Sequence, residues 1–333
     1  MITPDLVPAA VVAAAVAPAL LSLWLAVAAD SRPEPARVVL IALVLGALSA
    51  LAAAAIELLL QRLLPMAHQP LLAGLQEGLV GAAIPEEIAK VSLIAAIAMR
   101  SRHFDEPMDG VVYGAAVGLG FALLENIGYV AREASWQGVA VMRGVLSVPL
   151  HGAFGAIAGA YIARARFSGI LGSGRSTRWR RPRLFALAFL VPTVLHGAFD
   201  SSLFAAKNAA DASAADPAAA VAILLELLVA VVVGFGTIIF AVVLARRIAR
   251  RQKAWMTTRR LPAGHWRDVW AECLIGLGLS FVGVTVLVAG ASAGAKLGGA
   301  LLLAAAAGLA RRCARRLNAI AWSRHRETAA ATP

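Results

Sequence analysis

The sequence has few charged residues, few aromatic residues and only two cysteines. Charged residues make up 15% and aromatic residues 6% of the 333 positions, whereas 60% are hydrophobic. Soluble globular proteins carry about 25% charged and about 45–50% apolar residues, so this composition argues against a water-soluble domain. With only Cys273 and Cys313, the chain has neither a disulfide framework nor the cysteine spacing of a metal site. The excess of apolar side chains must therefore face lipid.

Continuous apolar runs of about 20 residues, the length that crosses a bilayer as a helix, occur nine times. Because the runs do not alternate as the strands of a membrane barrel do, each of them predicts a helix. The predicted fold class is all-α: a polytopic, multi-pass helix bundle in the cell membrane, with about nine transmembrane helices. The runs lie at about 7–29, 37–60, 72–99, 109–131, 139–163, 184–206, 218–245, 270–289 and 297–312.

Acidic residues are outnumbered, with 19 Asp and Glu against 31 Lys and Arg and a net charge of +12. The basic residues assigned to the two sets of loops divide 25 against 5, and Lys90, inside the third run, is counted in neither set. The positive-inside rule then predicts an N-terminus outside the cell and a C-terminus in the cytoplasm. The basic loops 164–183 and 246–267 are expected to contact anionic lipids. No aromatic residues interleave the basic runs as in a nucleic-acid-binding module, so no nucleic acid is expected as a partner.

Ionisable residues are concentrated in four consecutive apolar runs, although a charge at the centre of a bilayer costs roughly 2.5–3.5 kcal/mol. His151 and His196 are the only two of the six histidines that lie within apolar runs. A convergence of this kind is typical of a functional site. The polar residues are Glu86, Glu87 and Lys90 in the third run, Glu125 and Asn126 in the fourth, His151 in the fifth, and His196 and Asp200 in the sixth.

Helical spacing places these side chains on shared faces. Glu86 and Lys90 are four residues apart, as are His196 and Asp200, so each pair shares one helix face. The segment Leu-His-Gly-Ala-Phe at 150–154 recurs at 195–199, on a run of opposite direction. The two histidines are therefore expected to face one another across a pocket.

Small residues and prolines accompany the polar residues. Glycines at 110, 114 and 118 form a ladder on the face of the fourth run that leads to Glu125, and such ladders let helices approach closely. Pro85 precedes the two adjacent glutamates and removes one helical hydrogen-bond donor. We expect Pro85 to open a new helix segment with Glu86 and Glu87 in its first turn.

These residue types suit the hydrolysis of a peptide bond inside the membrane. That reaction needs a base to activate water, an acid for the leaving amine and stabilisation of an oxyanion. Glu86 or Glu87 is the candidate base, with the histidines as donors to the oxyanion or the leaving nitrogen. Alternatively, His151, His196 and Glu125 supply the three ligands of an open zinc site. The zinc-dependent mechanism and the metal-free, glutamate-type mechanism both stay open at this point.

These residues resemble those of the PrsW family of intramembrane proteases, distant kin of the CAAX prenyl endopeptidases. The resemblance covers about residues 70–205. It implies cleavage of a single-span membrane protein near its transmembrane segment, with an anti-sigma factor as the type of substrate. Glu125 and Asp200 replace a histidine and an asparagine of the prenyl branch, which argues against a CAAX substrate. The motifs are Glu86-Glu87-x-x-Lys90, Phe121-x-x-x-Glu125-Asn126, His151 and His196-x-x-x-Asp200.

The resulting domain prediction has four parts. Residues 1–70 form N-terminal transmembrane helices, 71–206 a catalytic four-helix membrane core, 207–312 C-terminal transmembrane helices with a basic cytoplasmic loop, and 313–333 a basic cytoplasmic tail. A proton-coupled transporter is the alternative function, because Glu, His and Asp also form proton relays. Transporters commonly show an inverted repeat of whole halves, and here only the five-residue repeat is found. A non-catalytic membrane scaffold is a third possibility.

Overall fold

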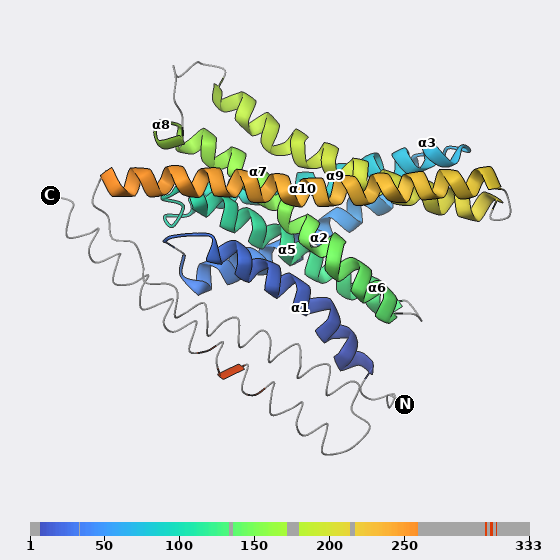
Figure 1. Ribbon diagram of the computed structural model, residues 1–333, viewed down its shortest axis with the longest axis horizontal. Helices are drawn as coiled ribbons and strands as arrows, with labels where there is room; N and C mark the ends of the chain where they lie inside the picture. The colour runs from blue at the N-terminus through green and yellow to red at the C-terminus, as the bar shows by residue number, and fades with distance from the viewer. Residues whose placement is uncertain are drawn as a thin grey trace.

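A computed structural model describes residues 7–32, 34–132, 136–171, 180–213 and 217–258, together with residues 304, 307, 308 and 311 (Figure 1). Every regular element in this part of the chain is a helix, which confirms the all-α prediction. The elements are α1 (Val7–Ala28), α2 (Ala36–Leu63), α3 (Pro70–Leu75), the π-helical segment η2 (Gln76–Ala83), α4 (Ile84–Arg100), α5 (Pro107–Arg132), α6 (Trp136–Met142), the π-helical segment η3 (Arg143–Ser147), α7 (Val148–Arg166), α8 (Ser168–Leu171), α9 (Arg180–Ser213) and α10 (Pro217–Thr258).

Five helical stretches are long and apolar enough to cross a membrane. They are α2, α5, the continuous stretch from α6 to α7, α9 and α10. The apolar part of α1, Ala14–Ala28, is shorter, and the stretch from α3 to α4 carries the charged cluster. Seven of the nine predicted runs thus coincide with helices. The run at 270–289 and nearly all of the run at 297–312 lie outside the described residues, so the count of nine stays a prediction.

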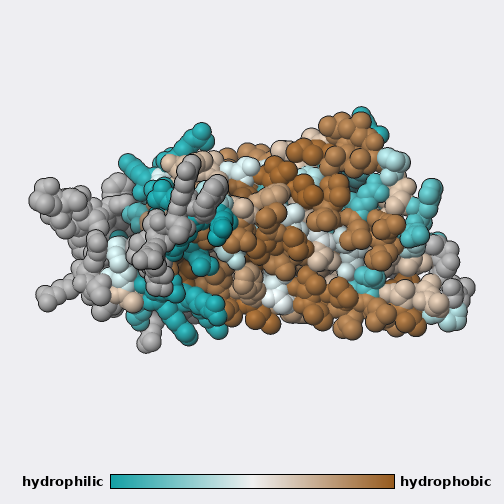
Figure 2. Space-filling view, turned by 90° about the horizontal axis from the view of Figure 1, so that it is seen from above, coloured by the Kyte–Doolittle hydropathy of each residue, from teal (hydrophilic) through white to brown (hydrophobic). Residues whose placement is uncertain are grey.

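The helices differ in how much of their surface they expose. In the most apolar window of α5, 78% of the residues are buried, against 28% in α2 and 22% in α10. Apolar side chains form a broad band on the surface, and hydrophilic ones gather toward the ends of the long axis, most densely where α10 ends (Figure 2). Because leucine and valine side chains on α2 and α10 face outward, a lipid environment is required to cover them.

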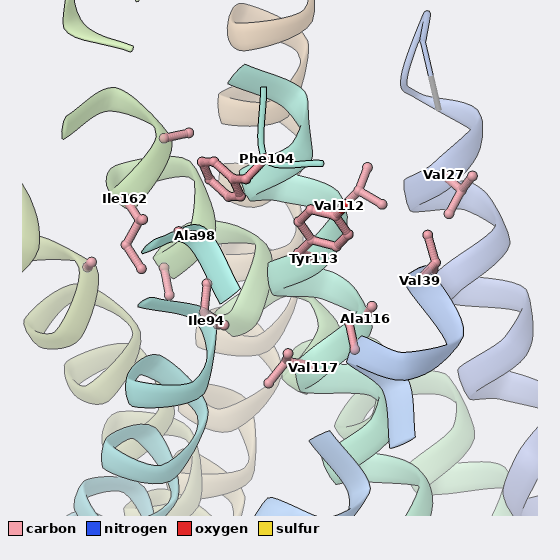
Figure 3. Packing of buried hydrophobic residues seen from close by; sticks show 14 residues of the cluster. Val27, Val39, Ile94, Ala98, Phe104, Val112, Tyr113, Ala116, Val117 and Ile162 are labelled. Carbon is pink, nitrogen blue, oxygen red and sulfur yellow. The ribbon is translucent and has the colours of Figure 1, made fainter. Parts of the chain in front are cut away.

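Helix α5 lies at the centre of the bundle and contacts α1, α2, α4 and α7. Its side chains Val112, Tyr113 and Val117 are fully buried. They belong to one cluster with Ile94 from α4 and Ile162 from α7, so a single core joins the helices that carry the polar residues (Figure 3).

Glycines bring α5 and α7 into backbone contact, as the glycine ladder predicts. A Cβ atom at Gly114 would overlap the carbonyl group of Gly155, and one at Gly118 would overlap the carbonyl oxygen of His151. Only glycine permits so close an approach at these two positions of α5. The contact holds the backbone of His151 against the helix that carries Glu125.

Two prolines mark changes of helical register. Helix α4 begins at Ile84 with Pro85 in its first turn, followed by both glutamates, as expected. The preceding segment η2 is π-helical and continuous with α4, so the chain changes hydrogen-bond register here without breaking. The segment η3 precedes Pro149 of α7 in the same way. Because proline lacks the N–H of the regular ladder, a wider turn accommodates it; the sequence pattern did not predict these π-helical turns.

Candidate active site

Helix α4 supplies three buried charges to the centre of the bundle. Glu87 and Lys90 are fully buried, and Glu86 is 5% exposed. The ammonium of Lys90 lies 3.1 Å from Oε2 of Glu86 and 2.7 Å from Oε1 of Glu87. The predicted pairing along one helix face is therefore present, and one cation is shared by two carboxylates.

The two histidines meet beside these charges. His151 comes from α7 and His196 from α9, and their ring centroids lie 5.1 Å apart with planes at 87°. Phe154 stacks on His196 at 4.7 Å, and the ring of Phe121 lies 5.5 Å from His151. The histidines thus face one another, as the repeated motif predicts, within a partly aromatic wall.

Each nitrogen of His196 has an acidic neighbour. Its Nδ1 lies 3.0 Å from Oε1 of Glu87, within hydrogen-bonding distance. A carboxylate accepts and does not donate, so this bond places a hydrogen on Nδ1. Its Nε2 lies 3.1 Å from Oδ2 of Asp200 and 3.8 Å from Oε2 of Glu86. By the same argument, the contact with Asp200 places a hydrogen on Nε2 as well, so Nε2 can bind a metal ion only after it releases that hydrogen.

His151 carries its ring hydrogen on Nε2 alone, by the same reasoning. Its Nδ1 lies 3.1 Å from Nζ of Lys90 and 3.8 Å from Oε2 of Glu86. An ammonium donates only, so Nδ1 accepts and the ring hydrogen is on Nε2. That Nε2 lies 3.0 Å from Oε2 of Glu125.

Glu125 and Asn126 have different surroundings. The same Oε2 of Glu125 that faces His151 also lies 2.7 Å from a guanidinium nitrogen of Arg143. These groups are close but not aligned as ideal hydrogen bonds, so the contacts are electrostatic. Asn126 accepts a hydrogen bond from Nε of Arg143 at 3.1 Å and donates one to the carbonyl of Ala15 at 3.0 Å. Asn126 therefore links α5 to η3 and α1.

Three of the buried side chains offer ligand atoms for a metal ion. Glu86, His151 and His196 each present one such atom, and the three atoms lie within 4.8 Å of one another. A carboxylate with two imidazoles is a ligand set found in zinc enzymes. The sequence predicts Glu125 as the third ligand, whereas the geometry groups Glu86 with the histidines, because the imidazole of His151 turns Nε2 toward Glu125 and Nδ1 toward the centre.

Arg143 is the residue near the site that sequence reasoning missed. The 25-to-5 division of basic residues counts it among the loops, but it lies in η3, inside the candidate span Trp136–Arg166. Its position eight residues before His151, on the same helical stretch, is the signal that would have found it.

Comparison with known proteins identifies the chain's relatives. Residues 34–235 match the family model described as PrsW family intramembrane metalloprotease. The chain is similar to Protease PrsW of Bacillus subtilis, with 42% identity over 106 residues, covering 32% of this chain and 44% of that protein. It is 38% identical to Protease PrsW of Geobacillus kaustophilus over 132 residues, covering 40% and 54%. For Protease PrsW of Clostridioides difficile the identity is 36% over 124 residues, covering 36% and 49%.

The chain spans about half the length of the curated relatives that it matches. No solved structure matches it. The family match covers more than half of the chain and includes every residue of the buried cluster. The family and the five apolar helical stretches make this a multi-pass membrane protein. The chain belongs to the PrsW family of intramembrane metalloproteases.

Proposed function

We propose that this chain is an endopeptidase that hydrolyses a peptide bond in a membrane-tethered protein. The observation that supports this most strongly is the buried cluster, in which α4, α7 and α9 bring carboxylates, an ammonium and two imidazoles together inside a membrane bundle. Buried ionisable groups in such a bundle mark a functional site by default. The proposed catalytic core is the segment 71–206, which contains all of these residues.

Zinc is the proposed metal. Glu86, Nδ1 of His151 and Nε2 of His196 would hold it, because each nitrogen lies 3.8 Å from Oε2 of Glu86. Nε2 of His196 would first release the hydrogen that it directs to Asp200. When bound, zinc supplies a Lewis acid that polarises a carbonyl and makes water a stronger nucleophile. Lys90 bonds to two of the three donor atoms. Its ammonium would have to move away from them, and Glu87 offers it a partner at 2.7 Å.

Glu87 is the proposed general base. Its Oε1 is held by Lys90 and by Nδ1 of His196, whereas its buried Oε2 has no hydrogen-bond partner among the described residues. That oxygen is available to take a proton from water and to return it to the leaving amine. In the metal-free alternative, Lys90 stays in place, Glu86 or Glu87 activates water, and the histidines donate to the oxyanion.

We propose that the remaining predicted residues orient or stabilise the groups that act on the substrate. Asp200 adds negative charge beside Nε2 of His196, and Glu125 does the same beside Nε2 of His151. Asn126 bonds to Ala15 and Arg143, and we propose that it positions Glu125 and Arg143.

The proposed substrate is a single-span membrane protein of the anti-sigma-factor type, which the resemblance to the PrsW family supports. The proposed orientation has the N-terminus outside and the C-terminus in the cytoplasm, with the basic loops on anionic lipids. The uneven distribution of Lys and Arg supports it. Labelling of a single cysteine introduced in the 164–183 loop tests this orientation. If a reagent outside intact cells labelled that cysteine, the proposed orientation would be contradicted.

Cleavage in proteoliposomes tests the proposed function. The purified protein is incubated with a panel of single-span proteins, and Glu86→Gln is compared with Glu226→Gln. Glu226 is a suitable control because it is a carboxylate of α10, inside a candidate span but outside the cluster. We expect cleavage by the wild type and Glu226→Gln, and none by Glu86→Gln. Wild-type cleavage by Glu86→Gln would contradict the site. Proton uptake without cleavage would favour the transporter alternative.

A further inference from the structure

Arg143 is a charged side chain at an unusual place. It lies in η3 within a candidate membrane span, and its side chain is only 16% exposed. Insertion of an arginine at membrane depth is unfavourable unless its charge is paired. Such a residue is therefore expected to have a partner that compensates its charge.

Its partners come from one face of α5. The guanidinium lies 2.7 Å from Oε2 of Glu125, its Nε donates to Asn126 at 3.1 Å, and it lies over the ring of Tyr129 at 4.0 Å from the centroid. Salt bridge, hydrogen bond and cation–π contact together fix the position of the guanidinium.

The same oxygen of Glu125 connects Arg143 to the candidate active site. Oε2 of Glu125 lies between Arg143 and Nε2 of His151, at 2.7 Å and 3.0 Å. A carboxylate beside the outer nitrogen of a histidine favours the tautomer that keeps the hydrogen there. The inner nitrogen, Nδ1, then keeps its lone pair toward Glu86 and Lys90.

We propose that Arg143 is a positioning residue, which holds the carboxylate of Glu125 beside His151 and thereby keeps Nδ1 of His151 available at the centre of the site. This inference rests on the proposed function only for its effect on cleavage. The arrangement of the imidazole is a property of the folded protein that can be measured without a substrate.

The test combines a spectroscopic readout with metal affinity and cleavage. Purified protein labelled with ¹⁵N at histidine is compared, without metal, as wild type, Arg143→Met, Arg143→Lys and Arg132→Met, with the His151 signals assigned by loss in His151→Gln. Arg132 is the control because it is an exposed arginine at the end of α5, the helix that carries Glu125. We expect the wild type, Arg143→Lys and Arg132→Met to show the hydrogen on Nε2. Arg143→Met should weaken that preference, which the ammonium of Lys90 then supports without Glu125.

Zinc affinity and cleavage should each fall by about 10–100-fold in Arg143→Met, the range seen when a partner of a metal-binding histidine is removed. In a Glu125→Gln background, Arg143→Met should cause little further loss, because Arg143 acts through Glu125. If Arg143→Met does not accumulate, Arg143→Gln takes its place, because its amide can still bond to Asn126. We expect Arg143→Gln to show the His151 spectrum predicted for Arg143→Met.

An unchanged His151 spectrum and unchanged zinc affinity, with a lower thermal stability, would show a purely structural role and overturn the inference. Independent, additive losses in the double variant would also overturn it. Absence of cleavage by the wild type would refute the proposed function but would leave the spectroscopic test of Arg143 intact.

Discussion

The imidazole rings of His151 and His196 lie edge to face, with centroids 5.1 Å apart, although the residues are 45 positions apart on helices α7 and α9. One nitrogen of each ring lies 3.0 Å from a carboxylate, of Glu125 and Glu87 respectively, and the other nitrogen lies 3.8 Å from Oε2 of Glu86. The arrangement leads to predictions that separate the roles of the two adjacent glutamates, the lysine and the packing glycines.

Glu86 and Glu87 should differ in how their loss affects the protein. Glu86→Gln removes a proposed ligand, so both zinc content and cleavage should be lost. Glu87→Gln removes the proposed base, so cleavage should fall by about 10²–10⁴-fold while the protein retains zinc. Zinc content, measured on the purified variants beside cleavage rates, checks this. Both variants should insert and accumulate. Wild-type turnover in both would end the assignment of this pair to catalysis.

Lys90 should stabilise the protein chiefly when no metal is bound. Its ammonium is fully buried and pairs with both Glu86 and Glu87, and breaking a buried charge pair costs about 3–5 kcal/mol. Lys90→Met should therefore lower the unfolding temperature of the zinc-free protein. Zinc should raise that temperature more in Lys90→Met than in the wild type, because the ion no longer competes with an ammonium. An equal zinc-induced rise in the two proteins would show that Lys90 and the ion do not share donor atoms.

Gly118 should tolerate no side chain, because a Cβ there would overlap the carbonyl of His151. Gly118→Ala should force α5 and α7 apart and destabilise the protein by about 1–3 kcal/mol, the usual cost of overpacking. Gly128→Ala is the matched control on α5, since nothing lies within 4 Å of its added Cβ. Alanine is favoured over glycine inside a helix, so the control should be neutral or slightly stabilising. Thermal unfolding in detergent compares them. Equal effects of the two substitutions would contradict the close helix contact.

Glu34, in the segment between α1 and α2, should make stability depend on pH. Burial, with the nearby charges of Asp105, Asp30 and Glu106, raises the pKa of Glu34 from 4.5 to about 9, although a hydrogen bond from Tyr113 at 2.9 Å opposes the rise. The folded protein therefore binds a proton that the unfolded chain releases above about pH 4.5. The stabilising effect is complete below pH 4.5 and is lost as the pH rises toward 9.

The unfolding temperature of the wild type should accordingly fall between pH 5 and pH 9 more steeply than that of Glu34→Gln. The comparison of the two proteins separates the contribution of Glu34 to the pH dependence from the contributions of two other groups. These are His103, whose Nδ1 lies 3.7 Å from Glu34, and the buried carboxyl of Asp109. Parallel pH profiles for the two proteins would show that Glu34 releases its proton in both states alike.

The helices and the convergence of polar residues were predictable because each has a local signal. Apolar runs indicate the helices, and the spacing of Glu86 with Lys90 and of the two His motifs indicates shared and facing surfaces. Both arrangements are present in the structure. The glycine ladder likewise predicted the approach of α5 to α7.

The third candidate ligand and Arg143 were not predictable in the same way. Which nitrogen of His151 points to the centre depends on Lys90 and Glu125, which come from two other helices, so sequence spacing alone does not choose between Glu125 and Glu86. Arg143 looks like a loop residue by charge counting, and only its contacts on α5 reveal its place. The π-helical segments depend on how the chain accommodates Pro85 and Pro149 within packed helices.

The metal content of active enzyme tests the central claim most directly. The purified protein and His196→Ala are analysed for transition metals and assayed with a tethered single-span substrate, before and after treatment with a strong chelator. The account predicts about one zinc ion per chain in the wild type, loss of zinc in His196→Ala, and cleavage that the chelator stops and added zinc restores. Fully active wild-type enzyme that contains no transition metal would contradict the zinc site and leave the glutamate-type mechanism.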